Sequence, residues 1–187
     1  MKEHLRPTRA EATDVANAVL DGTDAVMLSA ETAAGAHPIE SLQMMDRIVR
    51  VTESSRRPGS SYIRGESYAD ALADAACRAA DDICAKVLVA VTHSGFTARL
   101  LSKFRPAVPI IAFTPDRAVI ARLPFYWGVI PKHIRPFDNI DQMLRNIEKT
   151  LLEEKIAKKN DRIVIITCSP LPTQGKTNFM KLHEIGG

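Results

Sequence analysis

The chain has 187 residues, enough for one ordinary domain or for one domain and part of another. Its composition, with 45% hydrophobic and 25% charged residues and a net charge of +3, is typical of a folded globular protein. The basic residues are spread along the chain and only 5% of the residues are aromatic, so we expect no nucleic-acid partner.

The sequence predicts a cytoplasmic protein without a membrane span. No apolar run approaches the roughly 20 residues that a span needs, and residues 1–4 lead into no apolar signal core. The three cysteines, Cys77, Cys84 and Cys168, cannot all pair internally and lack the close spacing of metal ligands. We expect reduced thiols, with Cys77 and Cys84 as small buried side chains on one helical face.

A stretch of small, charged and helix-breaking residues at 54–61 divides the chain near residue 60. Before it, the apolar pattern predicts a helix over 13–20, a buried strand over 25–28 and a helix over 39–51. Thr13 or Asp14 is expected to cap the first helix. A lone strand cannot close a sheet, so this part must pack against something that the chain does not encode.

Beyond the linker, amphipathic helices alternate with continuous apolar strands. This alternation indicates a doubly wound α/β fold, with a mostly parallel five-stranded sheet covered on both faces. The last segment alternates apolar and polar residues, as an antiparallel edge strand would. The predicted helices span 68–83, 97–104, 117–126 and 140–156, and the predicted strands span 87–91, 109–113, 128–130, 163–166 and 179–185.

The turn Thr92-His93-Ser94-Gly95-Phe96-Thr97 joins a buried strand to a helix and is suited to hold a phosphate. Three hydroxyls, the backbone amides freed by Gly95 and the positive end of the helix all favour an anion there, and His93 adds charge when protonated. The alternative is that Ser94 or Thr97 simply caps the helix. Capping explains one hydroxyl but not three.

A second turn, over 169–178, lies between the last two predicted strands. Its Gly175-Lys176-Thr177 is like the end of a nucleotide phosphate loop, but the upstream glycine is missing and no helix follows, so a Walker-type site is rejected. We expect Thr173, Gln174, Gly175 and Lys176 to close over a phosphorylated ligand. The alternative is a plain surface hairpin.

Other polar residues carry no site by themselves. His37, His93 and His133 are too scattered for a metal site or a catalytic relay. Glu31 lies near Ser29 in an acid/base arrangement, but the rest of a pocket is not evident. We therefore predict no metal ligand in this chain.

Several long segments match a family pattern. Before the linker they are the run Arg6-Pro7-Thr8-Arg9-Ala10-Glu11 and the run from Asp14 to Thr32. Beyond it they are Thr92-x-Ser94-Gly95-x-Thr97, Arg105-Pro106 to Pro109-Ile110, Gly128-Val129 and Gly175-x-Thr177-Asn178. The first set resembles the last quarter of the (β/α)8 catalytic barrel of pyruvate kinase, and the second resembles its C-terminal regulatory domain. The resemblance implies a barrel remnant over 1–60 and a regulatory α/β domain over 61–187.

The resemblance implies glycolytic transfer of a phosphoryl group from phosphoenolpyruvate to ADP, with Mg²⁺ and K⁺, in a homotetramer. Thr8 matches the threonine that contacts the substrate, and Ser29 matches a serine thought to help deliver the proton. The turn 92–97 and the loop 171–176 match the segments that hold the phosphates of a sugar-phosphate effector. The barrel strands that carry the metal-binding carboxylates are absent from this chain, so we expect it to be inactive alone and to bind neither metal.

Departures from the family pattern bear on the ligand. The motif Ser29-Ala30-Glu31-Thr32-Ala33-Ala34-Gly35 is closer to the second bacterial type. Pro172-Thr173-Gln174 lacks the glycine-rich sequence of relatives that use fructose 1,6-bisphosphate, which favours another sugar phosphate or a nucleotide monophosphate. Two alternatives stay open. The first is a binding module, which either senses such ligands by itself or complements a separate barrel chain. The second is a truncated chain without a function of its own.

Overall fold

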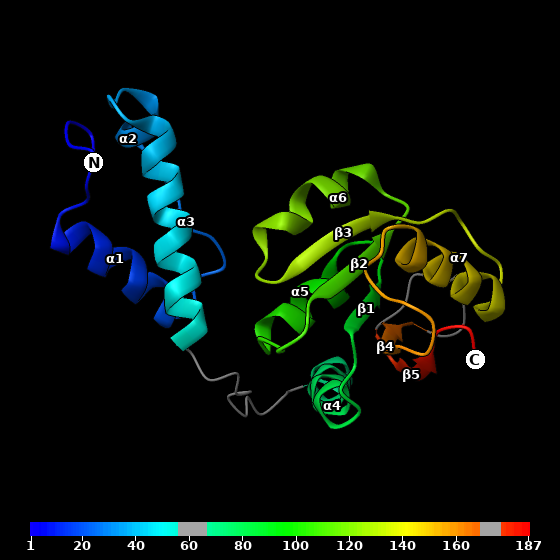
Figure 1. Cartoon of the computed structure of the whole chain (residues 1–187). Helices are drawn as coiled ribbons and strands as arrows, with labels where there is room; N and C mark the ends of the chain where they lie inside the picture. The colour runs from blue at the N-terminus through cyan, green and yellow to red at the C-terminus, as the bar shows by residue number, and fades with distance from the viewer. Residues whose placement is uncertain (56–66, 169–176) are drawn as a thin grey trace. The chain divides into compact units, whose positions relative to one another are not determined.

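A computed structural model describes residues 1–55, 67–168 and 177–187 of the chain. The chain divides into two compact units, Met1–Arg57 and Pro58–Gly187 (Figure 1). None of the helices within the described ranges is long and apolar enough to cross a membrane.

The first unit consists of three helices: α1 (Arg9–Leu20), α2 (Ala30–Ala33) and α3 (Pro38–Ser55). Helix α1 begins earlier than predicted, because Thr8 rather than Thr13 or Asp14 is its N-cap. The Thr8 hydroxyl accepts from the Glu11 amide, while the Glu11 carboxylate accepts from the Thr8 amide at 2.7 Å. This reciprocal capping box satisfies two amides that the helix leaves unpaired.

The buried strand predicted over 25–28 is wrong. These residues form no strand, and the Met27 side chain is 85% exposed. A β-strand needs a neighbour for its backbone hydrogen bonds, and no other strand exists among the described residues of this unit. The apolar run identified a segment suited to a sheet, but its partners are not in this unit.

The second unit is built on a five-stranded sheet with the order β3-β2-β1-β4-β5. Four strands are parallel, and β5 pairs with β4 in the antiparallel direction, which confirms the predicted fold class. The strands are β1 (Val87–Val91), β2 (Ile110–Thr114), β3 (Val129–His133), β4 (Arg162–Thr167) and β5 (Phe179–Glu184).

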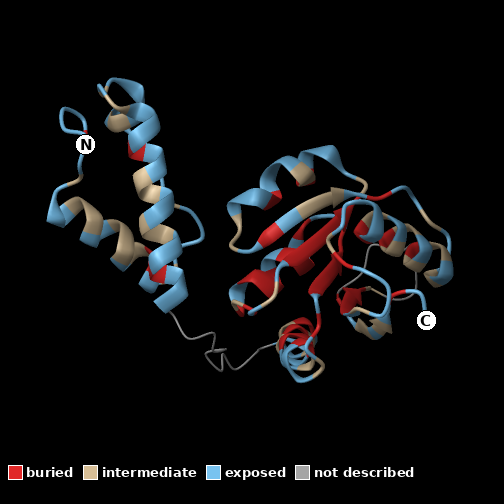
Figure 2. Cartoon of the chain, in the orientation of Figure 1, coloured by how far each residue is buried: buried red, intermediate tan, exposed pale blue. Residues whose placement is uncertain are grey.

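Helices cover both faces of this sheet. Leu88 and Ala90 of β1 pack under α4, α5 and α6, whereas Val87 and Val89 pack under α7, as alternation along a strand requires. The buried residues accordingly concentrate in the central strands and the helix faces turned toward them (Figure 2). The helices are α4 (Tyr68–Asp82), α5 (Phe96–Lys103), α6 (Arg117–Arg122) and α7 (Ile140–Glu153).

One predicted helix and one predicted cysteine differ from the structure. Helix α6 ends at Arg122, and the chain continues as the 3₁₀ turn η1 (Leu123–Phe125), where Pro124 supplies no amide hydrogen. Cys77 is buried on α4, and burial raises the pKa of its thiol to about 12. Cys84 is exposed, because it lies beyond the end of α4 with a φ of 50°.

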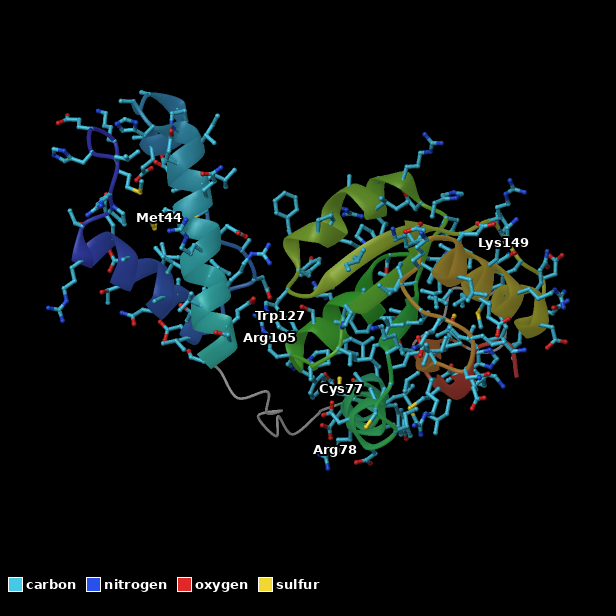
Figure 3. The ribbon with its side chains drawn as sticks, in the orientation of Figure 1. Met44, Cys77, Arg78, Arg105, Trp127 and Lys149 are labelled. Carbon is cyan, nitrogen blue, oxygen red and sulfur yellow. The ribbon has the colours of Figure 1, made fainter. Side chains whose placement is uncertain are left out.

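The C-terminal end of α5 is anchored to the segment that precedes β3. The Ser102 hydroxyl donates to the Trp127 carbonyl at 2.7 Å. The guanidinium of Arg105 lies over the Trp127 ring, 5.1 Å from its centre (Figure 3). These contacts hold α5 in place, and its other end forms the site described next.

Candidate functional site

The carboxyl ends of β1 and β4 meet at the point where the direction of winding reverses. From β1 the chain passes through α5 to β2 on one side, and it returns from β3 through α7 to β4 on the other side of β1. Since α5 and α7 cover opposite faces, a crevice opens between these two strand ends, which is where doubly wound sheets bind ligands. Thr92 follows β1 and Cys168 follows β4 at this crevice.

The turn after β1 leaves the start of α5 open to an anion. Gly95 is the N-cap residue, with a φ of 85°, and has no side chain to cap the helix. Its amide donates to the Thr92 hydroxyl at 3.0 Å, and the Phe96 amide makes a longer bond of 3.4 Å to the Ser94 hydroxyl. The amides of the first helical turn lack intrahelical acceptors. The Thr92 and Ser94 hydroxyls thus contact amides of the turn itself, while Gly95 supplies no side-chain cap.

A pair of buried threonines ties this turn to the strand at the sheet edge. The hydroxyls of Thr97 and Thr177 lie 2.8 Å apart, although the two residues are 80 positions apart in the chain. Both side chains are buried. The bond fixes the first turn of α5 against the residues that enter β5.

These residues enclose a small hollow of about 100 Å³. Thr92 and Thr97 lie in its buried part, whereas His93 and Ser94 are exposed at its rim. Drug-sized pockets start at roughly 300 Å³, so the hollow suits a small group such as a phosphate. Gly95 shapes the turn through its backbone.

Five lining residues are absent from the set predicted for this site: Val91, which directly precedes the turn, and Phe137, Thr167, Cys168 and Thr177. The last four come from other parts of the chain, and only the topology brings them here. The sequence offers one signal for Thr167 and Cys168: they lie at the end of a predicted strand, and a parallel neighbour of β1 must end at the same edge of the sheet. The predicted loop residues Thr173, Gln174, Gly175 and Lys176 lie outside the described residues.

The two predicted substrate-side residues, Thr8 and Ser29, are exposed in the first unit. Thr8 is committed to the cap of α1, where its hydroxyl also donates to Glu11 at 2.9 Å. The Ser29 amide donates to the Glu31 carboxylate at 3.0 Å. Backbone amides of Glu31 and Ser29 lower the pKa of Glu31, so this carboxylate is ionised near neutral pH and is a poor proton donor.

An apolar groove of about 410 Å³ lies between α1, the 25–28 segment and α3. Glu31 lines it, but Thr8 and Ser29 do not. Within the ranges that the structure describes, no group of three or more His, Cys, Asp or Glu side chains is placed to hold a metal ion.

Two family models match the chain. The model described as "Pyruvate kinase, alpha/beta domain" matches residues 70–183, and the model described as "Pyruvate kinase, barrel domain" matches residues 1–42. The first covers strands β1 to β4, β5 except its last residue, and the turn 92–97.

Relatives and solved structures give the same result. A pyruvate kinase of Sporosarcina psychrophila is 40% identical over all of this chain and 33% of its own length, and one of Agrobacterium vitis is 41% identical over 96% of this chain and 38% of its own length. A crystal structure of a pyruvate kinase from Cryptosporidium parvum matches with a TM-score of 0.86 and 34% identity, over 98% of this chain and 37% of that one. This chain spans between a third and two fifths of the length of these proteins. The chain belongs to the pyruvate kinase family.

Proposed function

We propose that the chain is part of a cytoplasmic pyruvate kinase, with residues 1–60 as the last portion of the catalytic barrel and residues 61–187 as the regulatory domain. The complete enzyme would transfer a phosphoryl group from phosphoenolpyruvate to ADP with Mg²⁺ and K⁺, as a homotetramer. The matches to both family models support this division of roles. The 25–28 segment, which forms no strand here, supports it too, because a barrel would supply the neighbouring strands that this segment lacks.

The turn 92–97 is proposed to bind the phosphate of an effector, either a sugar phosphate or a nucleotide monophosphate. The observation that carries this proposal is the open first turn of α5, capped only by Gly95, at the winding reversal of the sheet. Backbone amides and the helix dipole favour negative charge there. The hydroxyls of Thr92, Ser94 and Thr97 complete a set of neutral partners for phosphate oxygens.

The proposal assigns regulation rather than chemistry to this turn. Phosphoryl transfer is driven by metal ions and positioned positive charge, and the described residues gather no metal-ligand cluster around the turn or elsewhere. In the complete enzyme, Thr8 would contact the substrate and Ser29 would help deliver a proton. The isolated chain should therefore show no turnover in a coupled assay with phosphoenolpyruvate, ADP, Mg²⁺ and K⁺.

Calorimetric titration of the chain with ribose 5-phosphate, AMP and fructose 1,6-bisphosphate tests the effector site. Ser94→Ala should weaken binding of the preferred ligand about tenfold, because a hydrogen bond to a charged group contributes roughly 1.5–3 kcal/mol. Thr150→Ala is the matched control, since its hydroxyl donates only to the Asn146 carbonyl of its own helix. Equal affinities for Ser94→Ala and wild type would overturn the proposed site.

A second candidate function is a stand-alone sensing module. It is favoured by the completeness of the second unit, whose sheet is covered on both faces by its own helices. The same titration bears on both candidates: effector binding by the isolated chain is compatible with either of them and shows that the second unit can sense the ligand without a barrel. Binding that appears only after a separate barrel chain is added favours the enzyme part.

A further inference from the structure

A second, larger hollow of about 280 Å³ lies between α5 and the α6–η1 segment of the second unit. It shares Ser94 and Phe96 with the phosphate-sized hollow but has a different floor and a different charge. Neither the sequence pattern nor the proposed effector site makes use of it.

The floor of this hollow is apolar. Val119 and Leu123 line it and are almost fully buried, at 2% and 1% exposure. Gly95 brings the turn close to them: a Cβ at this position would lie 3.2 Å from Leu123 Cδ2 and 3.3 Å from Val119 Cγ1. Because so little of these two side chains meets water, the apolar surface that a ligand could cover in this hollow belongs mainly to Phe96 and Tyr126.

Aromatic rings stand on two sides. Phe96 comes from α5 and is 43% exposed, and Tyr126 follows η1 and is half-buried. Rings in this arrangement favour a flat ligand, which can stack or make edge contacts with them.

Two cations complete the lining, and none of the described residues that line the hollow is acidic. Arg99 lies over the Phe96 ring, 5.7 Å from its centre, and Arg122 is the last residue of α6. Both are exposed, and no ion pair joins either to a carboxylate among the residues that the structure describes. Guanidinium groups bind carboxylates in a fork geometry that a neutral ligand cannot match.

We propose that this hollow binds a small aromatic carboxylate, with its flat apolar body against Phe96 and Tyr126 above Val119 and Leu123, and its carboxylate between Arg99 and Arg122. The volume of about 280 Å³ lies just below the roughly 300 Å³ at which drug-sized sites begin, which suits a ligand of one or two fused rings. Inorganic phosphate would satisfy only the cations, and a neutral ring would satisfy only the floor.

Calorimetric titration of the whole chain with 2-naphthoate, and separately with the neutral 2-naphthamide, tests the proposal. Wild type should prefer the carboxylate by about tenfold, and Arg122→Gln should remove most of that preference while leaving binding of the amide unchanged. Arg99→Gln should act in the same direction. Arg122→Lys keeps the charge without the fork and should fall between wild type and Arg122→Gln.

Arg117→Gln is the matched control, because Arg117 lies on the same helix, is exposed and does not line the hollow. It should bind both ligands as wild type does. The proposal is overturned if the amide binds as tightly as the carboxylate. It is equally overturned if the preference survives both Arg99→Gln and Arg122→Gln, since the ligand would then occupy another surface such as the apolar groove of the first unit.

Discussion

Gly95 is the residue on which both hollows of the second unit depend. Its φ of 85° places it in the left-handed region, and its missing Cβ lets the turn approach Val119 and Leu123. A side chain would face two costs: roughly 1–2 kcal/mol for the backbone conformation and about 1–3 kcal/mol for overpacking. Gly95→Ala should therefore lower the free energy of unfolding by about 2–5 kcal/mol, measured by urea denaturation.

Gly128→Ala separates these two costs. Gly128 has a φ of 69°, but a Cβ built there meets no atom within 4 Å. Only the conformational cost of roughly 1–2 kcal/mol should appear. If Gly95→Ala and Gly128→Ala lowered the free energy of unfolding by the same amount, overpacking against Val119 and Leu123 would contribute nothing to the cost at Gly95.

The residues of the candidate site differ in how far the sequence could predict them. Thr92, Ser94 and Thr97 are adjacent in the chain, and a glycine before an apolar helix is a local signal. Arg99 and Arg122 belong to different helices, and they line one hollow only because α5 and α6 cover the same face of the sheet. No local pattern in the sequence records that arrangement.

At the scale of elements, α4 begins with an ionised cap that makes stability depend on pH. The Ser67 hydroxyl donates to the Asp70 carboxylate at 2.6 Å, and the Asp70 amide donates back to Ser67 at 3.2 Å. Lys103 of α5 lies 3.6 Å from the same carboxylate. The Ser67 hydroxyl, with Lys103, lowers the pKa of Asp70 below its ordinary value of 3.8.

A lowered carboxyl pKa gives stability that is complete above pH 3.8 and is lost as the pH falls further toward the folded-state pKa. Asp70→Asn should therefore be less stable than wild type by about 1 kcal/mol at pH 7, and the gap should shrink below pH 3.8. Urea denaturation from pH 7 to pH 2.5 measures it. Glu153→Gln, which removes only an exposed partner of Lys149, should cost less than about 0.5 kcal/mol. A gap that widens on acidification would contradict this account.

The elements that the sequence predicts well are those whose partners lie in the same unit. Strand β1 has the predicted bounds, because its apolar run pairs with β2 and β4 on either side. The run over 25–28 has the same appearance but forms no strand, since hydrogen-bond partners decide whether such a run becomes β structure. Helix α1 begins at a Thr8–Glu11 capping box, which is visible in the sequence. The prediction used the apolar pattern alone and therefore placed the start of the helix too late, at residue 13.

For the whole molecule, the two units should differ strongly in local stability. Among the described residues of the first unit only Met1, Val19, Ser41 and Thr52 are buried, while the second unit has two large apolar clusters. Several apolar side chains of the first unit are not packed: Leu20, Met27 and Leu42 are each more than half exposed. Little apolar burial therefore opposes local opening there.

Hydrogen exchange followed by mass spectrometry should show this difference directly. We expect amides of α1 and α3 to exchange at least about a hundredfold faster than those of β1 and β4, because opening the sheet requires both clusters to be disrupted. If residues 1–60 are part of a barrel, a separately produced chain with the other barrel strands should slow exchange in α1 and α3 by covering their apolar side chains. The strands β1 and β4 are the internal control and should not change. Slow exchange of α1 and α3 in the isolated chain would mean that the first unit folds without such a partner.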